Sequence, residues 1–97
     1  MIKHIVMFQF HGVSNKNETL KQLKDQMEDL KNSIQEIAHL EAGINFSKRD
    51  AAYDLVLVSD FQSEEDLETY RQHPEHLKLI DELKKHNYEV AVVDYKY

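Results

Sequence analysis

A tyrosine, two histidines and the only proline of the chain lie together in the segment 70–76, Tyr-Arg-Gln-His-Pro-Glu-His. The imidazole of His76 can take up or release a proton near neutral pH. The phenol of Tyr70 can donate a hydrogen bond to an oxygen that gains negative charge. A carboxylate in the last predicted strand, Asp94, is expected to fix the tautomer of His76 and to raise its pKa. His76, Tyr70 and Asp94 are therefore the predicted catalytic groups, suited to abstracting a proton next to a carbonyl.

The same residues have a second interpretation, as polar groups that satisfy one another between a helix and the sheet, without any chemistry. The sequence leaves both interpretations open. His73 precedes Pro74 and is expected to cap the helix that this proline begins. His4 alternates with apolar residues, so it is expected either to line the same pocket or to be a satisfied core histidine. We name His4 and His73 as the candidate ligand-binding residues.

No metal or cofactor site is predicted. His73, His76 and Asp94 carry ligand types that suit zinc or manganese, but their spacing matches no known ligand motif. The chain has no cysteine, which excludes disulfides and zinc–thiolate sites. Its two glycines form no phosphate-binding loop.

Length and composition predict a single globular domain over residues 1–97. Hydrophobic residues make up 41% of the chain and charged residues 31%, which is ordinary for a soluble protein. A net charge of −6, with no basic stripe, argues against nucleic-acid binding. The longest aliphatic runs, 55–58 and 90–93, are too short to span a bilayer, so no membrane association is expected. No signal peptide is readable, so a cytoplasmic location is the expectation.

Hydrophobic periodicity predicts the elements that position these residues. One long helix carries apolar side chains at spacings of three and four from Leu20 to Ile37, with Asn15 or Asn17 as its cap. A second helical segment begins after Ser63 and is divided at Pro74, because the residue before a proline is pushed out of the helical region. The part that Pro74 begins is expected to turn Leu77, Ile80 and Leu83 toward the core. The predicted strands are residues 2–10, 40–47, 53–61 and 88–95. The order β-α-β-β-α-β is that of the ferredoxin-like unit, an α+β fold with an antiparallel sheet.

Both faces of the predicted sheet are apolar. In the first strand Ile5 and Met7 alternate with Val6 and Phe8, and the third and last strands repeat this pattern. Right-handed crossovers place both helical segments on one face, so the other face needs a second cover. We therefore predict a homodimer in which two sheets face each other as a shared α/β barrel.

Several segments match one known family in order along the whole chain. The most specific are 70–76, with its Tyr-x-x-His-Pro-x-His pattern, and the closing Val93-Asp94-Tyr95. The opening strand 2–8, the start of the third strand and the segment 61–67 match as well. The chain thus resembles the Dabb family, the stress-responsive α/β-barrel domains. It departs from the family at 35–37, where members often carry a proline and a glycine, and this affects the shape of one loop.

The resemblance implies a dimeric ferredoxin-like barrel. The family includes stress-associated plant proteins, bacterial proteins of unknown role and a plant polyketide cyclase that performs an aldol condensation without a cofactor. The acid–base histidine and tyrosine of this cyclase correspond to His76 and Tyr70, and its pocket histidine and strand-four acid correspond to His4 and Asp94. Its aromatic and histidine pocket positions on the long helix and third strand correspond to Met27 and Leu55, which implies a chemically plainer pocket.

The sequence is consistent with three hypotheses about function. The leading hypothesis is a stress-responsive barrel domain that binds a small organic ligand in a cleft between helices and sheet. The first alternative is a cofactor-independent enzyme that uses His76 and Tyr70, either an aldol catalyst like the polyketide cyclase or a monooxygenase of the dimeric-barrel type. The absence of tryptophan weakens the monooxygenase version. The second alternative is a structural, oligomer-forming protein without a ligand.

Overall fold

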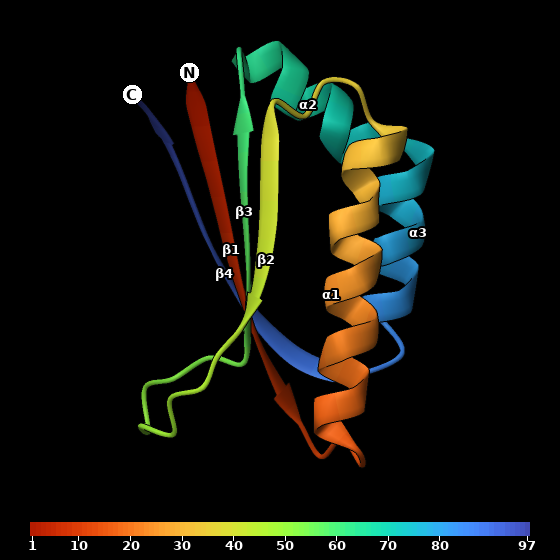
Figure 1. The fold of residues 1–97 in the computed structure, drawn as a ribbon, viewed down its shortest axis with the longest axis vertical. Helices are drawn as coiled ribbons and strands as arrows, with labels where there is room; N and C mark the ends of the chain where they lie inside the picture. The colour runs from red at the N-terminus through yellow and green to blue at the C-terminus, as the bar shows by residue number, and fades with distance from the viewer.

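The computed structural model describes residues 1–97 as a four-stranded antiparallel sheet with helices packed against it (Figure 1). The strands lie in the order β2-β3-β1-β4. This is the ferredoxin-like α+β fold, so the predicted architecture is confirmed. In chain order the elements are β1 (Ile2–His11), α1 (Lys16–Ser33), β2 (His39–Ile44), β3 (Leu55–Phe61), α2 (Glu64–Gln72), α3 (Pro74–Leu83) and β4 (Asn87–Lys96).

All the helices cover the same face of the sheet, with α1 and α3 running side by side along it (Figure 1). The core lies between these two layers. The helix α1 contributes a buried stripe at spacings of three and four, which removes its apolar side from water. This stripe consists of Leu20, Leu23, Met27 and Leu30.

The long helix is shorter than its apolar pattern predicts. It ends at Ser33, so Ile34 and Ile37 lie in the following loop rather than on the helix. Both are nevertheless buried, with exposed fractions of 0% and 6%. The backbone is extended at Ile34, where the helix ends. The loop that follows keeps the apolar spacing of three and four residues, so Ile34 and Ile37 still belong to the core. Asn15 stands at the predicted cap position, but its side chain makes no capping hydrogen bond.

A side-chain cap starts each of the helices α2 and α3, as predicted. The Ser63 hydroxyl accepts a hydrogen bond from the Asp66 N–H at 3.1 Å and starts α2. His73 is extended, and its Nδ1 accepts from the Glu75 N–H at 3.1 Å, which starts α3 directly after α2. Pro74 occupies the first turn of α3, where a missing N–H costs nothing.

The buried side of α3 differs from the predicted one. Leu77 was expected to face the core, but it is 50% exposed. Leu79 is buried in its place, and Leu83 is buried as predicted. The inner stripe begins at His76 and continues at spacings of three and four through Leu79, Ile80 and Leu83, so Leu77 lies outside it. His76 is therefore turned toward the sheet.

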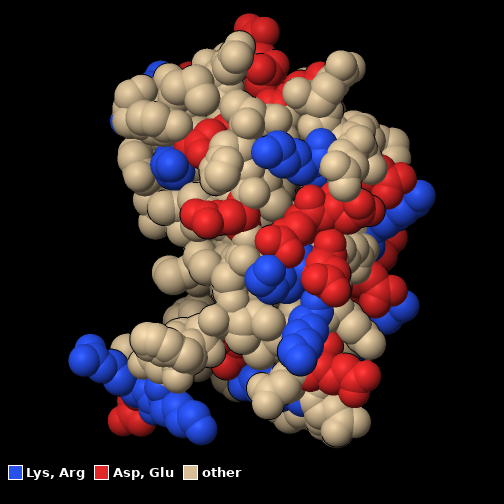
Figure 2. Space-filling view, viewed as in Figure 1, with Lys and Arg blue, Asp and Glu red and all other residues tan.

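The sheet face away from the helices is apolar, as predicted. Met7 lies between Val56 on β3 and Ala91 on β4, and these positions share that face. Val93, on the same face, is 54% exposed. Figure 2 shows charged side chains concentrated over the helices, whereas the sheet side of the molecule is mainly uncharged. None of the helices combines the length and apolar character needed to cross a membrane.

Candidate functional site

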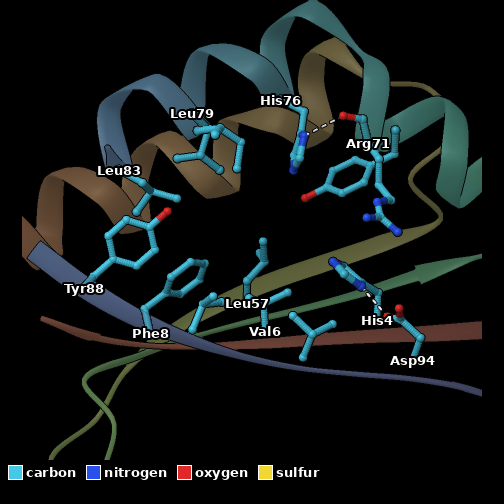
Figure 3. A pocket seen from close by; sticks show the side chains of 14 residues that line it. His4, Val6, Phe8, Leu57, Arg71, His76, Leu79, Leu83, Tyr88 and Asp94 are labelled. Atoms are coloured by element: carbon cyan, nitrogen blue, oxygen red, sulfur yellow. Dashed lines mark hydrogen bonds and ion pairs between the residues drawn. The ribbon is translucent and has the colours of Figure 1, made fainter. Parts of the chain in front are cut away.

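A cavity of about 210 Å³ lies between α3 and the helix-facing side of the sheet (Figure 3). Its walls are mainly apolar, and they come from β1, β3 and β4 below and from α3 above. The apolar lining includes Val6, Phe8, Leu57, Leu79, Ile80 and Leu83. The predicted cleft between helices and sheet is therefore present in the fold.

The cavity opens along the edge strand β4. Val90 and Val92 line it, yet they are 51% and 52% exposed. The strand β4 has a neighbour only on one side, β1. The cavity is therefore open to solvent along this edge.

Polar side chains gather at one end of the cavity. Figure 3 shows His76 and Arg71 approaching from the helices, and His4 and Asp94 approaching from the sheet. The opposite end, near Tyr88, is mostly apolar. The fold thus brings Tyr70, His76, Asp94 and His4 to one cavity, although they come from four separate elements.

Asp94 pairs with His4 and not with His76, so the predicted His76–Asp94 pair is wrong. The carboxylate Oδ1 of Asp94 contacts Nδ1 of His4. The two residues face each other across β1 and β4 in the antiparallel register, where directly opposed side chains meet. Because a carboxylate accepts hydrogen bonds, His4 carries a proton on Nδ1, and its other ring nitrogen is left for the cavity.

His76 is held by the backbone instead of by a carboxylate. Its Nδ1 lies 2.9 Å from the carbonyl oxygen of Arg71. A carbonyl oxygen can only accept, so Nδ1 donates, and the neutral ring keeps its lone pair on Nε2.

The pKa of His76 is lowered, in contrast to the predicted increase. Burial lowers this pKa below its ordinary value of 6.5. The hydrogen bond to Arg71 acts in the opposite direction, and the positive charges of His4, Arg71 and His73 lower the pKa further. The ring of His76 is therefore uncharged at pH 7, and its Nε2 is available as a proton acceptor.

Tyr70 is the most deeply buried polar residue of the site. It is 0% exposed, and its hydroxyl has no hydrogen-bond partner. Burial raises the pKa of this hydroxyl, so it is a donor at neutral pH. The ring packs against Phe61 and His76, at centroid distances of 5.0 Å and 4.6 Å. The phenol is thus fixed in place while its polar atom is unused.

Three other predicted positions lie away from the cavity lining. His73 caps α3, and its Nδ1 is used by the Glu75 N–H. Met27 and Leu55, expected as pocket residues, are core residues with exposed fractions of 0% and 1%, and neither lines the cavity. Leu57 is the β3 residue that does. The pocket is mainly apolar, as expected, but its apolar side chains are not Met27 and Leu55.

Arg71 is a cavity residue that the sequence analysis did not single out. It lies between Tyr70 and the His73-Pro74 corner, in the last turn of α2. Its position next to Tyr70 was the available signal. No group of three or more His, Asp or Glu side chains in the structure is arranged to hold a metal ion.

The profile of the Stress responsive A/B Barrel Domain family, Dabb, matches residues 2–97. The chain belongs to the Dabb family. No curated protein sequence gives a significant match.

Solved structures similar to this chain share its fold over nearly its whole length. A dimeric ferredoxin-like protein of unknown function from Bacteroides fragilis is 28% identical, with a TM-score of 0.90 over 99% of this chain and 95% of that one. A protein from Arabidopsis thaliana is 27% identical, with a TM-score of 0.80 over 100% and 95%. A hydroxynitrile lyase from Passiflora edulis is 20% identical and has a TM-score of 0.80 over 97% and 90%, which shows a shared fold.

Proposed function

We propose that the cavity binds a small, flat organic molecule with a mainly apolar body and an oxygen acceptor at one end. The observation that carries this proposal is the buried Tyr70 hydroxyl without a partner. A buried polar group left unsatisfied costs free energy, and few remain in folded proteins without a role. A carbonyl or phenol oxygen of a ligand would accept this hydrogen bond, with His4 and His76 beside it.

The size of the cavity sets the size of the ligand. An apolar cavity of about 150 Å³ is enough to bind benzene, and the cavity here measures about 210 Å³. It accommodates one aromatic ring with a short substituent, or an aliphatic molecule of similar bulk. A larger ligand would extend past Val90 and Val92 at the open edge.

Benzamide tests this proposal, because it combines one ring with one neutral carbonyl. We expect it to bind with a dissociation constant on the order of 1 mM, measured by titration calorimetry or ligand-observed NMR. Tyr70→Phe should weaken binding by about tenfold, because it removes the donor and keeps the shape. Tyr53→Phe, a hydroxyl loss outside the cavity, is the matched control and should bind as the wild type does. Equal affinities for wild type and Tyr70→Phe would contradict the proposal.

A specific observation favours a second candidate function, cofactor-independent acid–base catalysis. His76 presents an unprotonated Nε2 at neutral pH, and the donor of Tyr70 lies beside it at a ring-centroid distance of 4.6 Å. In a bound ketone, His76 would take the proton from the carbon next to the carbonyl. The electrons of the broken C–H bond would move to the carbonyl oxygen, where the Tyr70 hydroxyl stabilises the enolate.

Acetophenone tests the catalytic candidate, because it is similar in size to benzamide and carries exchangeable methyl protons. In heavy water, the wild type should exchange these protons for deuterium faster than buffer alone, as measured by proton NMR. His76→Gln should remove this acceleration, since glutamine fills the space without a titrating nitrogen. Exchange that is no faster than in buffer would leave the protein as a binder, and an undiminished rate in His76→Gln would exclude His76 as the base.

We also infer that the chain forms a homodimer through the open face of the sheet. Similar structures from Bacteroides fragilis and Thermobifida fusca are described as dimeric. In this chain, Met7 and Val93 on that face are 36% and 54% exposed. An apolar sheet face of this kind is stabilised when a second copy covers it. The cavity lies on the opposite face, so dimerisation would leave its opening at β4 outside the paired sheet faces.

A further inference from the structure

Around the polar end of the cavity, one charged side chain has no partner. Arg71 makes no side-chain hydrogen bond and no ion pair, although it lines both this cavity and the neighbouring one. Every other charged residue that lines these two cavities has a polar contact of its own. The contacts are Glu64 with Lys96 at 3.2 Å, Glu68 with Gln72 at 2.8 Å, and Asp94 with His4.

The position of Arg71 directs its guanidinium to the ligand site. It follows Tyr70 directly on α2, and Figure 3 shows it reaching from the helix toward His4 and Asp94 on the sheet. It is the only lysine or arginine that lines the cavity. Two adjacent residues, the buried Tyr70 and the exposed Arg71, therefore both have hydrogen-bond donors without a protein partner at the same end of one apolar cavity.

We propose that Arg71 binds the carboxylate of an organic acid whose apolar body occupies the cavity. This inference rests on the proposed ligand-binding function and names the class of ligand. A guanidinium offers a planar pair of N–H donors that match the two oxygens of a carboxylate, and such charge-assisted hydrogen bonds are strong. The apolar walls hold a ring or chain, while the acid group remains at the cavity mouth beside Arg71.

The carboxylate of Asp94 does not pair with the guanidinium of Arg71. Asp94 lines the same cavity, but its Oδ1 is engaged by Nδ1 of His4. Arg71 and Asp94 form no ion pair. The guanidinium is thus the group left free to receive an incoming anion.

The test compares two ligands of nearly the same shape, benzoate and the neutral benzamide. The wild type should bind benzoate about tenfold more tightly than benzamide, measured by titration calorimetry above neutral pH. In Arg71→Gln the two affinities should become equal, with benzamide binding within about twofold of the wild type. Arg49→Gln removes the same charge from the 45–54 loop, away from the cavity, and should retain the preference for benzoate.

A cation of the same size gives a second measurement that needs no variant. Benzylamine should bind to the wild type more weakly than benzamide, because its ammonium group meets Arg71. A preference for benzoate that survives in Arg71→Gln overturns this inference, as does tighter binding of benzamide or benzylamine than of benzoate. In either case, Tyr70-dependent binding of benzamide would leave the proposed function standing. If the wild type binds none of the three, both the inference and the proposed function are overturned.

Discussion

Replacing Tyr70 with phenylalanine is expected to make the unliganded protein more stable. The substitution removes one oxygen atom from a site where it has no hydrogen-bond partner. The ring itself, which is 0% exposed, keeps its packing against Phe61 and His76. If the hydroxyl serves to bind a ligand, it lowers the stability of the unliganded protein, because it has no partner there. If it serves the core, it does not lower the stability.

The magnitude follows from the cost of an unsatisfied buried hydroxyl, which is about 1–3 kcal/mol. We expect the free energy of unfolding to rise by about 1 kcal/mol, the lower end of this range. In a domain of this length, that gain raises the melting temperature by about 4–8 °C.

Urea and thermal unfolding, followed by circular dichroism, measure this change. All variants must be compared at one protomer concentration, because dimer formation makes apparent stability depend on concentration. Tyr53→Phe is the matched control. Tyr53 is only partly buried and its hydroxyl makes no hydrogen bond within the chain, so the loss of this hydroxyl should change stability by less than about 0.5 kcal/mol.

A destabilisation of about 1 kcal/mol or more in Tyr70→Phe would refute this reasoning. It would mean that the hydroxyl has a structural hydrogen bond in solution. Tyr70, together with its histidine neighbours, would then be a satisfied polar cluster between helix and sheet, and the structural interpretation of the segment 70–76 would hold.

Three further predictions test other parts of the structure. Burial lowers the pKa of His76, so the unfolded chain binds this proton more readily; its contribution to stability is complete above pH 6.5 and is lost as the pH falls below that value. Urea midpoints should therefore fall more steeply on acidification for the wild type than for His76→Gln, and equal slopes would contradict this. Ser63→Ala removes the cap of α2 and should lower the free energy of unfolding by about 1 kcal/mol in thermal unfolding; no change would show that the cap at Asp66 is not formed. Val58→Lys places a charge on the open sheet face and should convert the proposed dimer into a monomer by light scattering, whereas an intact dimer would locate the interface elsewhere.

The fold could be predicted from the sequence because its helices and strands have clear hydrophobic periodicities. Alternating residues mark β1, β3 and β4, and a Ser63 cap and Pro74 mark the two helix starts. The errors arise where burial is set by three-dimensional packing. Ile34 lies in a loop that continues the helix spacing. Leu77 is exposed although α3 begins where predicted, because the packing of α3 on the sheet decides which of its sides faces inward.

Four of the five candidate site residues line one cavity, but His73 does not, and the contacts among the four differ from those predicted. The four are Tyr70, His76, His4 and Asp94. The pairing of Asp94 was wrong because strand register decides it: Ile2 lies opposite Lys96, and the same register places His4 opposite Asp94. That register requires β1 and β4 to be neighbours, a long-range fact that local patterns do not contain.

The most direct test of a ligand-binding cavity is a titration of isotope-labelled protein with benzamide, followed by amide and methyl chemical shifts in NMR. We predict saturable shifts that cluster at residues around the cavity, including Val6, Leu57 and Leu79, and that weaken in Tyr70→Phe. An absence of shifts at millimolar benzamide, or shifts confined to Ile5 and Val58 on the open face of the sheet, would contradict the assignment of the cavity as the binding site.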